Sequence, residues 1–181
     1  NMLKLSSLLY LSGADPVYMD YYERALYNHI LSSQHPEHGG LVYFTPMRPR
    51  HYRVYSQAEE NFWCCVGTGI ENHMKYGEMI YAYAGSRLLV NLFIPSRLNW
   101  EEEGVVIEQR SDIPDGDSSE FVISTDNARE FELSVRLPSW SDEDKIEIQV
   151  NGKSLDDPDL SGGYINIRRL WEDGDKVHIK L

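Results

Sequence analysis

The sequence is poor in cysteine and in basic residues, and it lacks long apolar runs. Only two of its 181 residues are cysteines, Cys64 and Cys65, and a bond between such neighbours would close a small strained ring that staples no loop. Lys and Arg number 17 against 29 Asp and Glu, so the net charge is −12 and a phosphate backbone is an unfavourable partner. No apolar run is long enough to span a bilayer, and no internal repeat is present. We therefore expect neither a nucleic acid nor a membrane as a partner.

The composition is otherwise that of a folded domain. Hydrophobic residues make up 41% of the chain and charged residues 25%, which argues against disorder. Residues 1–84 carry 6 basic and 8 acidic side chains, whereas residues 85–181 carry 11 and 21. The chain opens inside an amphipathic pattern, which predicts a fragment boundary. The cysteine count leaves the cellular compartment open, because cysteines that bind a metal would stay reduced in any compartment.

The first half has helical spacing. Leucines from Leu3 onward predict a helix that stops at Gly13, and Asp15-Pro16 predicts the start of a second helix that runs to about Ser32. Residues 35–63 form a long segment rich in arginine, histidine and tyrosine around a short strand at 41–44, which suits either a binding loop or an ordinary surface loop.

The second half has the period of strands. Apolar alternation predicts strands at 88–94, 105–109, 120–125, 130–137, 145–150, 164–167 and 176–181, separated by Asp-Gly and Asn-Gly turns. Short strands at this spacing indicate an antiparallel β-sandwich. The fold class predicted is α+β, with a boundary near Gly85-Ser86 that divides the chain into 1–85 and 86–181.

The cysteine pair precedes a predicted helix. Thr68 and Glu71 have capping-box spacing, and the apolar residues that follow continue a helical pattern to Gly85. Amide donors at a helix start favour an anion, so a thiol there can have a lowered pKa and act as a nucleophile or metal ligand. The alternative is a pair of small buried apolar residues.

Three kinds of chemistry remain open from the residues alone. Zinc would need further ligands from among Glu59, Glu60, Glu71 and His73, none of which has a recognisable zinc spacing. A Cys/His hydrolase would use His51 or His73 as its base. Glu59 and Glu60 are adjacent and point apart in an extended segment, which disfavours them as a glycosidase carboxylate pair.

Three segments carry a resemblance to a known family. They are YYERALYNHIL at 21–31, YFTPMRP at 43–49 and FWCCVGTG at 62–69. In this order they resemble the β-L-arabinofuranosidases of glycoside hydrolase families 127 and 146, long described as the domain family DUF1680. The strand-rich tail with LWEDGD at 170–175 is also similar to theirs.

The resemblance implies a fold and a set of roles. The family fold is an (α/α)6 barrel followed by β-sandwich domains, so this chain would hold the last barrel helices and most of one sandwich. The family is a retaining glycosidase with a cysteine nucleophile and a zinc ion held by three cysteines and a glutamate. By resemblance Cys64 is the nucleophile, Cys64 and Cys65 are zinc ligands, and Tyr43 binds the sugar.

The resemblance also implies what lies elsewhere. The family's general acid/base glutamate and its other two zinc ligands precede a helix like the one that opens this chain. We therefore expect a carbohydrate-active parent enzyme acting on L-arabinofuranosyl linkages, and an inactive fragment that lacks the upstream barrel. The alternative is a carbohydrate-binding or interdomain sandwich without catalysis, in which one or more of four tryptophans stacks on sugars: Trp63, Trp100, Trp140 and Trp171.

Overall fold

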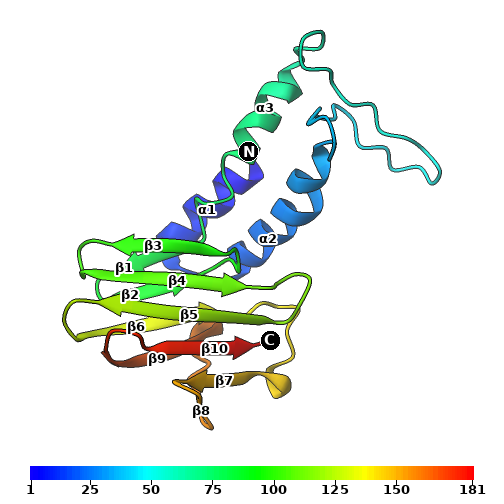
Figure 1. The fold of residues 1–181 in the computed structure, drawn as a ribbon. Helices are drawn as coiled ribbons and strands as arrows, with labels where there is room; N and C mark the ends of the chain where they lie inside the picture. The colour runs from blue at the N-terminus through cyan, green and yellow to red at the C-terminus, as the bar shows by residue number, and fades with distance from the viewer.

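The computed structural model describes all residues 1–181 as a helical region set against two stacked sheets (Figure 1). The helices are α1 (Met2–Gly13), α2 (Val17–Ala25) and α3 (Cys64–His73). After α2 the chain continues through a π-helical turn, Leu26–Ile30, and a 3-10 turn, Leu31–Ser33. The predicted α+β class is confirmed. None of the three helices is long and apolar enough to cross a membrane.

The first two helices form where the leucine spacing predicts them. α1 ends at Gly13, and Ala14 after it has φ 53°, the left-handed geometry common after a helix. Asp15 Oδ1 accepts a hydrogen bond of 3.0 Å from the Val17 amide, which satisfies a free donor at the start of α2. The second helical segment reaches Ser33, one residue beyond the prediction, although its last two turns are not α-helical.

Ten strands make two sheets. The four-stranded sheet has the order β1-β2-β6-β9 and the six-stranded sheet the order β3-β4-β5-β10-β7-β8. All pairs are antiparallel except β2 with β6, which is parallel. Eighteen buried residues fill a core that draws on both sheets, as expected for a sandwich. The strand bounds are β1 Tyr81–Ala84, β2 Arg87–Val90, β3 Ser96–Trp100, β4 Val105–Ser111, β5 Ser118–Thr125, β6 Arg129–Arg136, β7 Glu147–Val150, β8 Lys153–Ser154, β9 Tyr164–Trp171 and β10 Lys176–Lys180.

The helix predicted to reach Gly85 is wrong in its second half. α3 ends at His73, and Tyr81–Ala84 is strand β1, which pairs with β2 in a hairpin. Gly85 has φ 59°, which lets the chain reverse within two residues, since Ala84 lies opposite Arg87. The register with β2 gives this segment inter-strand hydrogen bonds, and this pairing outweighs its helical spacing.

Two predicted strands are shorter than expected. The run at 88–94 contributes only its first part to β2, which ends at Val90. The next residue, Asn91, is fully buried, and its amide donates to the Ile80 carbonyl at 2.8 Å. Residues 41–44 form only isolated bridges, from Leu41 to Gln34 and from Val42 to Tyr55. A strand that the sequence did not indicate, β3, follows β2 along the chain.

The helical region meets the sandwich at an interface that we call the junction. Its apolar part is a second cluster of buried residues, drawn from α1, the α2 segment, β2 and β9, and including Tyr10, Met19, Tyr22, Leu26, Leu89, Leu92 and Tyr164. At its edge, Asn91 Oδ1 accepts hydrogen bonds from Tyr10 Oη at 2.9 Å and from Tyr164 Oη at 3.0 Å. The two regions therefore share a core.

The junction also contains a fully buried arginine. Arg136, at the end of β6, donates through Nε to the Asn91 carbonyl at 2.7 Å and through Nη1 to Asp20 on α2. Its Nη2 lies 2.7 Å from Glu23 Oε1, an ion-pair contact rather than a well-aligned hydrogen bond. Two carboxylates of α2 thus neutralise one guanidinium of the sandwich and fix the position of α2 on the sheets.

Candidate functional site

The two thiols are the first two residues of α3. Trp63 precedes the helix with an extended backbone (φ −79°, ψ 156°), so Cys64 and Cys65 lie in the first turn rather than before it. Both are free; Cys64 is exposed and Cys65 is partly buried. Their Sγ atoms lie 3.8 Å apart. The two cysteines therefore form no disulfide, and they are not the pair of small buried apolar residues that was the alternative.

The predicted capping box is absent. Thr68 is inside α3, where its Oγ1 donates to the Cys64 carbonyl at 3.3 Å. Glu71 forms an ion pair with Lys4 of α1, and the hydrogen bond from Lys4, followed by its charge, lowers the pKa of Glu71. The helix begins five residues earlier than the Thr68–Glu71 spacing indicated, with Trp63 rather than Thr68 at the N-cap position.

The environment raises the pKa of Cys65 rather than lowering it. Partial desolvation is the main cause, followed by the hydrogen bond and charge of the neighbouring Cys64 thiol. Two adjacent thiols disfavour two adjacent negative charges. The lowered pKa predicted from the helix start is not found at Cys65 in this chain, so a thiolate there needs a further positive group.

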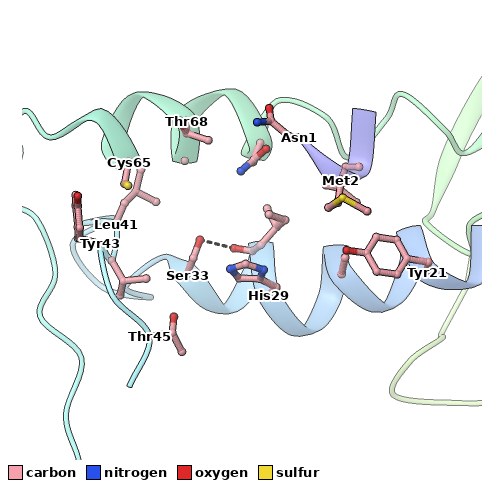
Figure 2. A pocket seen from close by; sticks show the side chains of 16 residues that line it. Asn1, Met2, Tyr21, His29, Ser33, Leu41, Tyr43, Thr45, Cys65 and Thr68 are labelled. Atoms are coloured by element: carbon pink, nitrogen blue, oxygen red, sulfur yellow. Dashed lines mark hydrogen bonds between the residues drawn. The ribbon is translucent and has the colours of Figure 1, made fainter. Parts of the chain in front are cut away.

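Cys65 and Tyr43 line one cavity of about 460 Å³. Figure 2 shows Cys65 and Thr68 on α3 facing the α2 segment across this space, with Tyr43 at one end. The Tyr43 ring packs edge-on against Trp63, with centroids 5.9 Å apart, which ties it to the start of α3. The structure thus brings together two of the three residues singled out from the sequence, and Cys64 adjoins them.

His29 is a cavity residue that the sequence analysis missed. It is exposed in the π-helical turn Leu26–Ile30, and Figure 2 shows it on the floor of the cavity. Short π-helical turns within helices are frequent at functional sites. The one sequence signal for His29 is a polar residue within an apolar helical pattern, and this feature is too common to identify a functional residue.

The loop that follows Tyr43 projects away from the helices (Figure 1). Its side chains line a second, mainly apolar cavity of about 450 Å³, formed by Tyr43, Phe44, Pro46, His51, Tyr52, Val54 and Trp63. Arg53 Nη1 donates a hydrogen bond to the Ser32 carbonyl. Tyr43 lines both cavities and so lies between this one and the one that Cys65 lines.

Neither candidate base is hydrogen-bonded to a cysteine. His51 Nδ1 lies 3.0 Å from its neighbour's carbonyl, Tyr52 O. His73 Nδ1 lies 2.8 Å from Tyr76 Oη, and burial lowers the His73 pKa. The geometry of the chain gives no support to a Cys/His pair.

The spacing of the two thiols suits two ligands of a tetrahedral zinc site. In a tetrahedral site with Zn–S bonds of about 2.3 Å, two thiolate sulfurs lie roughly 3.8 Å apart, which is the separation seen here. No group of three or more His, Cys, Asp or Glu side chains in residues 1–181 is arranged to hold a metal. Glu59, Glu60, Glu71 and His73 therefore do not complete the site. The pair fits two ligand positions of four.

Comparison with family profiles covers nearly the whole chain. Residues 1–78 match the profile of the β-L-arabinofuranosidase GH127 catalytic domain, and residues 87–181 match that of the GH127 middle domain. A comparison with curated proteins gives no match.

Solved structures give the same answer. A GH127 β-L-arabinofuranosidase from Geobacillus stearothermophilus T6 aligns over 99% of this chain with 25% identity and a TM-score of 0.79. A GH127 β-arabinofuranosidase at 23% identity and a glycoside hydrolase at 20% have the same fold, with TM-scores of 0.80 and 0.82. The chain spans 30–31% of the length of these proteins. On the profile matches, this chain belongs to the GH127 family of β-L-arabinofuranosidases.

Proposed function

We propose that this chain is the nucleophile-bearing part of a retaining, zinc-dependent glycosidase that acts on L-arabinofuranosyl linkages. Cys64 is the proposed nucleophile, Cys64 and Cys65 are two zinc ligands, and Tyr43 contacts the sugar. The observation that carries the proposal is the 3.8 Å separation of the two sulfurs beside a cavity that Cys65 and Tyr43 share. The family match supplies the reaction class.

The chemistry follows from two adjacent thiols, of which Cys64 is exposed. Bound zinc would supply the positive charge that keeps both thiols deprotonated near neutral pH. The Cys64 Sγ then attacks the anomeric carbon as the bond to the leaving oxygen breaks, and an acid from outside this chain protonates that oxygen. Water next displaces the sulfur from the same carbon, so two inversions give net retention. Tyr43 orients the sugar through its exposed ring and hydroxyl.

The helices supply the proposed frame. We infer that α1 and α2 are the last helices of an (α/α)6 barrel, that residues 1–85 belong to it, and that the sandwich occupies 86–181. One face of α1 supports this, because its apolar side chains are exposed: Met2, Leu5, Leu8, Leu9 and Leu11. Such a face buries itself against neighbouring helices in a bundle or barrel. The general acid/base and two zinc ligands would come from the other helices of that barrel.

The test compares cysteine variants in a protein of the length of the relatives. Cys64→Ser should lower turnover of an aryl β-L-arabinofuranoside by about a thousandfold or more, because an alcohol is a far weaker nucleophile than a thiolate. Cys65→Ser should lose bound zinc as well as activity, because metal affinity depends on the complete ligand set. Lys153→Ala, a change of an exposed residue in β8, is the control for handling and folding.

Two results would contradict the proposal. Equal activity of the wild type and Cys64→Ser would remove Cys64 from the mechanism. The 181-residue chain alone should show no turnover, since it has two of four ligands; sustained hydrolysis by it that depends on Cys64 would show that no missing part is required.

A further inference from the structure

Trp140 is the one tryptophan of the four with a largely exposed ring. Trp100 and Trp171 lie in the sandwich core and Trp63 is partly buried, whereas Trp140 is 53% exposed. Its Nε1 donates to Glu23 Oε2 at 2.9 Å, so the polar edge of the indole is satisfied inside the protein. An exposed indole that is held by its own N–H presents a rigid apolar surface without a free polar edge.

A cavity of about 300 Å³ adjoins this ring. It lies between α2 with its π-helical turn, the Ser139-Trp140 segment and Ile113-Pro114. The α2 residues that line it are on a different face of the helix from Tyr21, Ala25 and His29, which line the Cys65 cavity. The two cavities therefore flank the same helical segment.

Three side chains beside Trp140 have unused hydrogen-bonding groups. Arg24, Tyr27 and Asn28 line the cavity at i, i+3 and i+4 spacing, which places them on one helix face. The side chains of all three form no hydrogen bond or ion pair within the chain. Together they offer donors and acceptors around a flat apolar surface, the combination that suits a ring with hydroxyls on its rim.

The charge balance of the cavity favours a neutral ligand. Asp20 and Glu23 are acidic, but Arg136 contacts both and Arg24 adds a second positive charge. Two positive and two negative side chains cancel, so neither an anion nor a cation is preferred. The lining combines apolar surface, from Trp140, Ile113 and Pro114, with polar side chains of α2, so a ligand with both an apolar face and polar groups is favoured.

We propose that Trp140, Arg24, Tyr27 and Asn28 form a second carbohydrate-binding site, which takes one neutral sugar unit. The sugar stacks a C–H face on the indole, and its hydroxyls bond to the α2 side chains. Only the expected identity of the glycan, one containing L-arabinofuranose, rests on the proposed function. The site binds the glycan at a place that does not involve Cys64. Glu23 connects it to the junction, because this carboxylate contacts both Trp140 and Arg136.

The test follows the four tryptophans separately. The chain is labelled with 5-fluorotryptophan, its resonances are assigned with single Trp→Phe variants, and a soluble L-arabinofuranose oligosaccharide is titrated in. Four dispersed signals report folding in the same spectrum. We expect the Trp140 resonance to shift in a saturable way, and Trp140→Ala to weaken binding by about tenfold, the upper value for one aromatic stacking contact.

Arg24→Ala and Asn28→Ala keep the indole and its Glu23 contact, and each should weaken binding several-fold. Lys153→Ala, a change in β8 at a residue that does not line the cavity, should leave affinity unchanged. A Trp140 resonance that stays fixed at saturating sugar, or full binding by Trp140→Ala, would overturn the proposal. The same titration in a protein of family length carrying Cys64→Ser separates the two proposals, because it measures binding without hydrolysis.

Discussion

The sandwich and the helical region differ in how far each completes its own core. The sandwich fills its core with eighteen buried residues that all come from β2 onward. The helical region buries one face against β2 and β9 at the junction, whereas α1 leaves a row of leucines exposed on another face. The candidate site lies in the less complete region, and its two cysteines would fill only two of the four ligand positions of the proposed zinc site. The exposed apolar face of α1 is of the kind that packs against further helices.

The largest expected effect is at the junction. Arg136→Ala leaves Asp20 and Glu23 without their buried partner, and removing one member of a buried ion pair typically costs about 3–5 kcal/mol of unfolding free energy. We expect the two regions to uncouple, so that far-UV circular dichroism and tryptophan fluorescence, which coincide in the wild type, report separate denaturant transitions.

The control for this variant is another arginine on a strand. Arg168 is 63% exposed and pairs with an equally exposed Glu130, so Arg168→Ala should cost less than about 1 kcal/mol. If the two variants had equal stability and coincident transitions, the buried arginine would not be what holds the regions together.

A pair of leucine variants measures the contrast directly. Leu133 in β6 is fully buried in the sandwich core, and Leu133→Ala should lower the unfolding free energy by about 2–5 kcal/mol. Leu8 in α1 is 66% exposed, so Leu8→Ala should change it by no more than about 0.5 kcal/mol. Denaturant titration of the 181-residue chain gives both values. A large loss at Leu8 would mean that the face of α1 is already covered, for example by a second copy.

The fall of the unfolding free energy at alkaline pH reports the burial of a tyrosine at the junction. Burial, together with the charge of Glu78, raises the pKa of Tyr22 to about 12. Unfolded tyrosines release their proton near pH 10, so the unfolded state holds fewer protons than the folded state between these values. The contribution of Tyr22 is therefore intact below pH 10 and is lost as the pH rises to about 12.

This loss amounts to roughly 2–3 kcal/mol for a shift of about two units. Tyr22→Phe should flatten the fall of unfolding free energy above pH 10, measured by urea titration at a series of pH values. Tyr52→Phe, in the exposed part of the loop, should leave the slope as it is. An unchanged slope in Tyr22→Phe would show that the junction is open to solvent.

The sandwich was the more predictable region. Alternating apolar residues and turn pairs identify its strands, and Asn151 and Gly152, with φ 52° and 74°, form the tight turn that their type predicts. These signals are local. The junction depends instead on contacts such as Arg136 with Asp20, which are 116 residues apart in sequence, and no local pattern reveals them.

The candidate site was predictable only in its parts. Adjacent cysteines and the Tyr43 motif are visible in the sequence, but the cavity that joins Tyr43 to Cys65 depends on how α3 packs over the α2 segment. The same limit explains the error at Thr68 and Glu71. Capping-box spacing recurs by chance, and the helix start was set by the extended backbone of Trp63 and by Lys4, which engages Glu71 from α1.

The smallest effect has a sign that separates the two interpretations of α3. As an N-cap, Thr68 would cost about 0.5–2 kcal/mol on replacement by alanine. Inside the helix, where the structure has it, Thr68→Ala should leave the unfolding free energy unchanged or raise it by up to about 0.5 kcal/mol, because alanine has the higher helix propensity. Asp15→Ala is the matched control, since Asp15 does accept a helix-start amide and its loss should be destabilising. Loss in both variants would return the start of α3 to Thr68 and take the two cysteines out of its first turn.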